Sequence, residues 1–113
     1  MPTVYPDFER DGFYLENAAM RAKLWPRAFV IPPDDERKSV RPGQTVKIDF
    51  TFAPESEPKE GNESERMWVA VKERVDDHWI GVLDNDPRFH DTIKSGHEFH
   101  FHPDHIVVIW RDS

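Results

Sequence analysis

The sequence predicts an α+β domain that is mainly β, either a strongly bent antiparallel sheet or a small SH3-like barrel, with one N-terminal helix. Apolar and polar residues alternate in several short runs, glycine-containing turns separate these runs, and one apolar stripe with helical spacing precedes them. The chain of 113 residues is expected to form a single domain over residues 1–113. That length is enough to hold a hydrophobic core without disulfides or metals.

The helix is predicted over residues 14–25. Its apolar side chains recur three and four residues apart, which places them on one helical face. They are Leu15, Ala18, Ala19 and Ala22. Pro26 ends the helix because a proline disfavours the helical conformation of the residue before it. Residues 29–31 then read as a short extended piece, and residues 34–38 as a helical turn with acids before bases.

The β region is predicted over residues 28–110. Pro42 and Gly43 occupy the central positions of a type II turn, and strict alternation follows over residues 46–52. Further strands are expected at residues 67–71, 78–83, 97–102 and 106–110, with Asp76 and Asp77 forming a turn. Ser95 and Gly96 repeat the turn chemistry seen near Gly43. The expected buried residues are Val46, Ile48, Phe50, Met67, Val69 and Val71.

Between these strands, residues 53–64 form a Glu-rich acidic loop that lacks any large apolar residue. The whole chain carries a net charge of −7, from 22 acidic and 15 basic residues. This charge argues against nucleic-acid binding, which requires clustered Lys and Arg on one surface. It indicates a partner protein with a basic surface or serves only to keep the protein soluble.

Several classes of function are disfavoured. The chain has no cysteine, which rules out disulfides, thiolate metal sites and a cysteine nucleophile. It shows neither a GxSxG elbow nor a glycine-rich phosphate loop, so we do not expect an enzyme or a cofactor. No signal peptide and no long apolar run is found, so we expect no membrane association and a cytoplasmic location.

The six histidines all lie in the last third of the chain. On the predicted strand, His100 and His102 share one face while Phe99 and Phe101 share the other, and His105 follows a Pro-Asp turn. Imidazoles two residues apart on a strand can bind a divalent metal when a third ligand is close. We do not predict a metal site, because no further ligand pattern supports these three candidates.

The candidate partner-binding residues are Trp68 and the polar elbow Asp84-Asn85-Asp86, with Glu65 and Arg66 at the start of the same strand as Trp68. Trp68 alternates with buried residues and is therefore expected on the outer surface. The other three tryptophans are predicted to be core or half-core residues: Trp25, Trp79 and Trp110. Turn chemistry alone also explains the elbow, since Asn and Asp side chains cap their own backbone before a proline.

Three segments match a known family in order and spacing: Arg66-Met67-Trp68-Val69, Leu83-Asp84-Asn85-Asp86-Pro87 and His105-Ile106. Over residues 29–106 the chain resembles a family of small bacterial proteins of unassigned molecular function, with a motif of the form ERMWV…LDNDP…HI. Some of its relatives look like immunity proteins encoded beside secreted toxins. The chain departs from the family pattern at Gly96-His97, where relatives have Gly-Asp, and in its longer acidic loop.

The resemblance implies a protein-binding module, such as an immunity protein that neutralises a cytosolic toxin by direct contact. The alternative is a small accessory domain that binds a ligand or a metal through its His-rich face. A bound metal would favour the alternative, whereas a neighbouring toxin gene would favour the immunity role.

Overall fold

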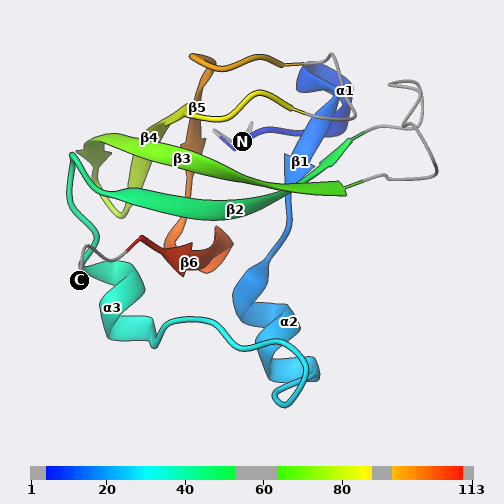
Figure 1. Cartoon of the computed structure of the whole chain (residues 1–113), viewed down its shortest axis with the longest axis vertical. Coiled ribbons are helices and arrows are strands. Elements are labelled where there is room, and N and C mark those ends of the chain that lie inside the picture. The colour runs from blue at the N-terminus through cyan, green and yellow to red at the C-terminus, as the bar shows by residue number, and fades with distance from the viewer. Residues whose placement is uncertain (1–4, 53–63, 88–92, 111–113) are drawn as a thin grey trace.

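The computed structural model describes residues 5–52, 64–87 and 93–110 (Figure 1). Its helices are α1 (Phe8–Asp11), α2 (Ala18–Leu24), α3 (Asp34–Lys38) and the 3₁₀ turn η3 (Pro103–His105). Its strands are β1 (Phe13–Leu15), β2 (Thr45–Phe52), β3 (Ser64–Val75), β4 (His78–Leu83), β5 (Glu98–Phe101) and β6 (Ile106–Ile109). No helix in these ranges has the length and apolar character needed to cross a bilayer.

The six strands form one antiparallel sheet in the order β1-β2-β3-β4-β5, with β6 paired to β2. The sheet curls strongly into a half-barrel, and α2 and α3 lie at its lower end (Figure 1). One edge of β2 pairs with β3, while the other edge pairs with β6 at residues 46–48 and with β1 at residues 50–52. The expected mainly β fold is confirmed, as a strongly bent sheet of this half-barrel form.

The concave face of the sheet holds the core. All six residues predicted to be buried are at most 3% exposed, which confirms the register of β2 and β3. Aromatic rings fill the centre: Phe50 lies 5.7 Å from Phe13 and 5.4 Å from Phe99, measured between ring centroids. Such aromatic pairs contribute beyond the area they bury.

The predicted helix over residues 14–25 is too long at its start. Tyr14 and Leu15 belong to β1, and Leu15 pairs with Phe50 of β2. The helix begins at Ala18 because Asn17 caps it, its Oδ1 accepting a hydrogen bond from the Met20 amide at 2.8 Å. Backbone pairing with β2 therefore outweighs the helical spacing of four apolar side chains.

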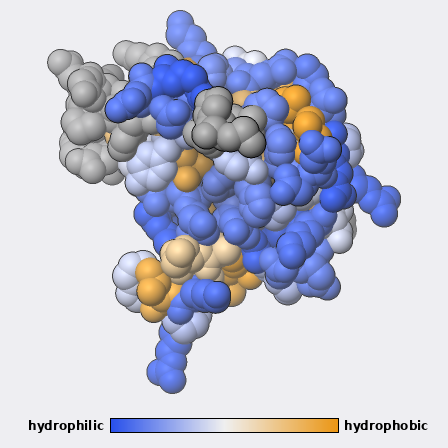
Figure 2. All heavy atoms as spheres, turned by 180° about the vertical axis from the view of Figure 1, so that it is seen from behind, coloured by the Kyte–Doolittle hydropathy of each residue, from blue (hydrophilic) through white to orange (hydrophobic). Residues whose placement is uncertain are grey.

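One side of α2 stays in solvent. Met20 and Leu24 are 55% and 60% exposed. Seen from behind, the molecule shows an apolar patch at this end of a mostly hydrophilic surface (Figure 2).

Residues 29–31 form no strand, so the predicted β region from residue 28 is wrong in that segment. The helix α3 matches the helical turn predicted after it.

The turns follow the predicted chemistry. Gly43 and Gly96 have φ angles of 95° and 98°, a conformation that glycine adopts without steric cost. Asp76 has a φ angle of 54° in the turn between β3 and β4, as Asp tolerates better than most residues. The acidic loop lies outside the described residues except for Ser64, which begins β3.

Replacing Phe50 with Ala should lower the free energy of unfolding by roughly 3–5 kcal/mol, the usual cost of emptying an aromatic core position. The side chain is fully buried, so little of the cavity can be refilled. Urea denaturation measures the change. The exposed Trp25 provides the control, since Trp25→Ala should change the unfolding free energy by less than about 0.5 kcal/mol. A loss below about 1 kcal/mol for Phe50→Ala would contradict the packing described here.

Candidate protein-binding surface

An aromatic pair occupies the convex face of the sheet. Trp68 of β3 and Trp110, which follows β6, meet edge to face with ring centroids 5.3 Å apart. Trp110 is 56% exposed and Trp68 is half-buried. Trp68 thus lies on the outer surface as predicted. The placement of Trp110 and Trp25 as core residues is wrong, because both are more than half exposed.

Strand register brings further side chains to this pair. Lys47 of β2 is paired with Trp68 on one side and with Val108 on the other. Its ammonium lies 4.8 Å from the Trp68 ring centre, within the range of a cation–π interaction. Val108 is 38% exposed. We call these four residues, Trp68, Trp110, Lys47 and Val108, the tryptophan platform.

The polar elbow is fastened to the backbone of Trp68. The Asp84 amide donates to the Trp68 carbonyl at 3.0 Å, and the Trp68 amide donates to Asn85 Oδ1 at 3.2 Å. Asn85 therefore has a structural role, whereas Asp84 and Asp86 are exposed. Asp84, Thr45 and the two tryptophans line a shallow hollow of about 240 Å³. The structure thus brings together Trp68, Asp84 and Asn85, three of the candidate residues named from the sequence.

Arg66 lies on β3 two residues before Trp68, as its place in the sequence predicts. Its side chain points to Asp49, with 3.8 Å between Nε and Oδ2, and its guanidinium lies 5.3 Å from the centre of the Phe29 ring. Its ion pair is therefore with β2 and not with the elbow. Glu65 is half-buried and pairs with Phe50 across the β2–β3 ladder. Arg66 is exposed two residues before Trp68 on β3 and therefore shares the outward face of the sheet, whereas Glu65 lies on the opposite face of the strand.

A buried carboxylate organises this side of the sheet. Asp49 is 5% exposed although its strand position points away from the core. Arg21 of α2 donates to Asp49 Oδ2 at 3.0 Å and also contacts Glu16 at 3.1 Å. Burial raises the pKa of Asp49 above its ordinary value, and the nearby Arg21 and Arg66 offset this only in part.

The three histidines considered as candidate metal ligands have other hydrogen-bond partners. His100 Nδ1 lies 2.9 Å from Nε2 of the buried His78, so the two rings share one hydrogen bond. His102 Nδ1 accepts from the Asp104 amide at 3.0 Å, and His105 Nδ1 accepts from the His102 amide at 2.9 Å. In the described ranges no group of three or more His, Asp or Glu side chains is arranged to hold a metal ion.

The last two bonds form a reciprocal cap around η3, in which each imidazole accepts from a backbone amide. Both bonds require an unprotonated Nδ1. Burial lowers the pKa of His105 to about 4, and the neighbouring His102 adds to this effect against the opposing charge of Asp104. The histidine of the His105-Ile106 motif is thereby explained as a capping residue.

The chain thus folds as a small curled sheet in which two motif residues, Asn85 and His105, bind the backbone. The family described as "uncharacterized protein conserved in bacteria" (DUF2314) matches residues 14–111. The chain belongs to this family, which confirms the resemblance to an uncharacterised bacterial family. No curated protein and no solved structure matches the chain.

Sequence reasoning missed Trp110 as a surface residue. The signal was present in its position two residues after Val108, on the same face of an extended segment. The short β6 strand obscured this alternation, because Ile106 and Val107 are both buried.

The capping role of His105 predicts a loss of stability in acid. The folded state holds its pKa at about 4, below the ordinary 6.5, so the unfolded chain binds a proton more readily. The stabilisation is fully present above pH 6.5 and declines as the pH falls toward 4. Between about pH 7.5 and pH 5, this residue should account for a loss of about 2 kcal/mol of unfolding free energy.

The matched variant is His105→Asn, whose side-chain oxygen can accept the same amide hydrogen bond but does not titrate. Urea denaturation at the two pH values should show a smaller acid loss for the variant than for the original chain. Equal losses in both proteins would show that His105 is not responsible.

Proposed function

We propose that this protein is a protein-binding module whose contact surface is the tryptophan platform together with the exposed carboxylates of the elbow. The single observation that supports the proposal most strongly is the solvent-facing pair of Trp68 and Trp110 beside Asp84. Exposed tryptophans at the centre of a rigid surface are typical energetic anchors of protein interfaces.

The platform is rigid because the sheet fixes both sides of it. Lys47 of β2 pairs with β3 and with β6, and the Trp110 amide donates to the Thr45 carbonyl at 2.9 Å. Two hydrogen bonds hold the elbow to Trp68. A surface fixed in this way loses little conformational entropy when a partner binds.

Charge favours a basic partner. Asp84 and Asp86 are exposed beside the platform, and the chain carries a net charge of −7. Acidic groups around an apolar centre accelerate association with a basic surface and penalise acidic partners. The complementary partner therefore presents an apolar side chain for the hollow between the tryptophans, surrounded by Lys or Arg.

More specifically, we propose an immunity role. The partner is then a toxin, and the module neutralises it by covering a basic surface of that toxin. The resemblance of the ERMWV and LDNDP segments to relatives of this kind supports the role. Toxins that act on nucleic acids need basic surfaces, and an acidic module is suited to cover one.

The test compares two tryptophans of equal exposure. Trp110 and Trp25 are 56% and 57% exposed, but only Trp110 belongs to the platform. Tagged protein should co-purify a basic partner from its own bacterium, and the same partner should be retained by Trp25→Ala. Trp110→Ala and Trp68→Ala should each weaken binding by roughly tenfold or more, as hot-spot truncations do.

Binding kinetics with the purified partner distinguish the role of the exposed carboxylates from the role of the tryptophans. Replacing Asp84 and Asp86 with Asn should lower the association rate and its dependence on salt. Trp68→Ala should instead raise the dissociation rate. Binding that is insensitive to salt and to every platform variant would contradict the proposal. A partner that is a basic toxin, inactive in the complex, would support the immunity role, and a partner that stays active would argue against it.

A further inference from the structure

Trp79 of β4 contains a buried hydrogen-bond donor that lacks an acceptor. The side chain is 1% exposed and stacks on Phe101, with ring centroids 5.7 Å apart. In the ranges that the structure describes, its Nε1 has no hydrogen-bond partner. A buried donor without an acceptor is costly and uncommon in folded proteins, so an unpaired one calls for an explanation.

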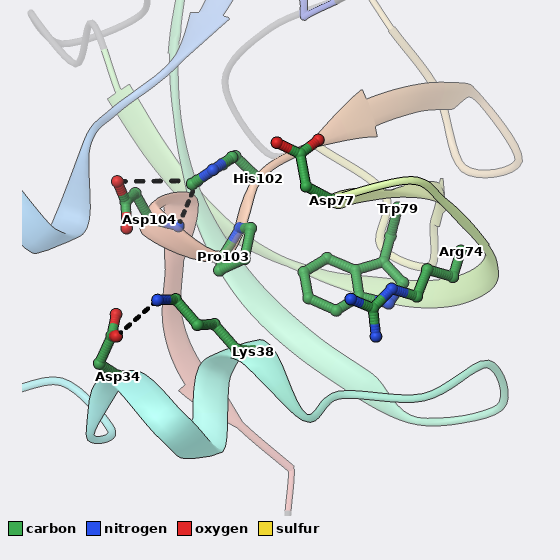
Figure 3. A pocket seen from close by; sticks show the side chains of 8 residues that line it. All are labelled: Asp34, Lys38, Arg74, Asp77, Trp79, His102, Pro103 and Asp104. Atoms are coloured by element: carbon green, nitrogen blue, oxygen red, sulfur yellow. Dashed lines mark hydrogen bonds and ion pairs between the residues drawn. The ribbon is translucent and has the colours of Figure 1, made fainter.

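The same tryptophan forms part of the wall of a pocket of about 500 Å³. Figure 3 shows that the lining side chains come from α3, from β3 and β4 with the turn between them, and from η3 and the residue before it. Its volume falls within the range of pockets that hold small molecules. The pocket therefore adjoins the residue that carries the unpaired donor.

A cation lies next to the unpaired donor. The Arg74 guanidinium lies over the Trp79 ring, 5.7 Å from the ring centre. Arg74 Nε donates to the Asp76 carbonyl at 3.1 Å, whereas its Nη atoms make no hydrogen bond within residues 5–52, 64–87 and 93–110. Arg74 is exposed, so its guanidinium is accessible from the solvent side of the pocket. A guanidinium together with an indole N–H can donate to the two oxygens of one carboxylate.

The other charges of the pocket are largely paired with one another. Lys38 contacts Asp34 at 2.9 Å, and Asp104 contacts Arg37 at 3.3 Å. Asp77 differs, because its side chain is 84% exposed and its ion-pair contact is with His78 at 3.4 Å. The exposed Asp77 carboxylate therefore lies on the rim of the same pocket that Arg74 lines (Figure 3).

We propose that this pocket binds a small molecule with a carboxylate at one end and an ammonium group at the other. The carboxylate accepts hydrogen bonds from Trp79 Nε1 and the Arg74 Nη atoms, and the ammonium group faces Asp77. A simple anion fits less well, because Asp34, Asp77 and Asp104 surround the site. The pocket shares no residue with the tryptophan platform, so this inference is independent of the proposed protein-binding role.

Three probes of equal length isolate the two charges: ω-aminohexanoate carries both, hexanoate lacks the ammonium group and hexylamine lacks the carboxylate. The readout is the indole N–H resonance of Trp79 in a ¹⁵N-labelled sample, assigned through Trp79→Phe. Titration with ω-aminohexanoate should shift this resonance downfield and slow its exchange with solvent. Hexanoate and hexylamine should each bind several-fold more weakly.

Two variants report the roles of the charged residues without emptying the core. Arg74→Gln should weaken ω-aminohexanoate binding by roughly tenfold or more, and Asp77→Asn should weaken it several-fold. The exposed residues Arg41 and Asp35 provide the controls, since Arg41→Gln and Asp35→Asn change the same charges away from the pocket.

Three results would overturn the inference. An indole resonance unmoved by every probe would mean that water is the acceptor of Trp79. Equal binding of hexanoate and ω-aminohexanoate would reduce the site to an anion pocket. Equal losses in the pocket variants and in their controls would show that only the net charge of the protein matters.

Discussion

The buried carboxylate of Asp49 is the constraint on which the outer side of this protein depends. It sits where one edge of β2 passes from β6 to β1, and the ladder register shifts just before it, between Lys47 and Ile48. The Asp49 carbonyl accepts the Glu16 amide at 2.9 Å, while its carboxylate contacts Arg21 and Arg66. One residue thus connects β1, α2 and β3 to the central strand.

The energetic balance at this site favours specificity over stability. The pKa of Asp49 is raised because burial outweighs its two arginine partners. A charge held at such a cost contributes little net stability, but any fold that buried it without its partners would be strongly disfavoured. The network therefore selects one docking of α2 against the sheet, and α2 in turn leaves its apolar side in solvent.

The strands were predictable because their signal is local. Strict alternation over residues 46–52 follows from the pleat, and glycine at 43 and 96 follows from positive φ angles. The helix start was not predictable from spacing, since Leu15 suits both a helical stripe and a β1 pairing that is set by β2. The alternation along β3 identified Trp68 as a surface residue, and the Asp-Asn-Asp-Pro turn motif identified Asp84. The unpaired Trp79 donor was not found, because it depends on α3, η3 and the β3–β4 turn meeting in space.

The reciprocal cap around η3 carries a consequence for how this family can vary. At positions 102 and 105 the side chains must present an acceptor to a backbone amide, and they need no charge to do so. Asn, Asp or Ser can take over that task at either position, whereas Lys and Arg have no acceptor atom at all. Relatives that replace one histidine are therefore expected to use short oxygen-bearing side chains there, and a basic replacement would have to be accompanied by a different connection between β5 and β6.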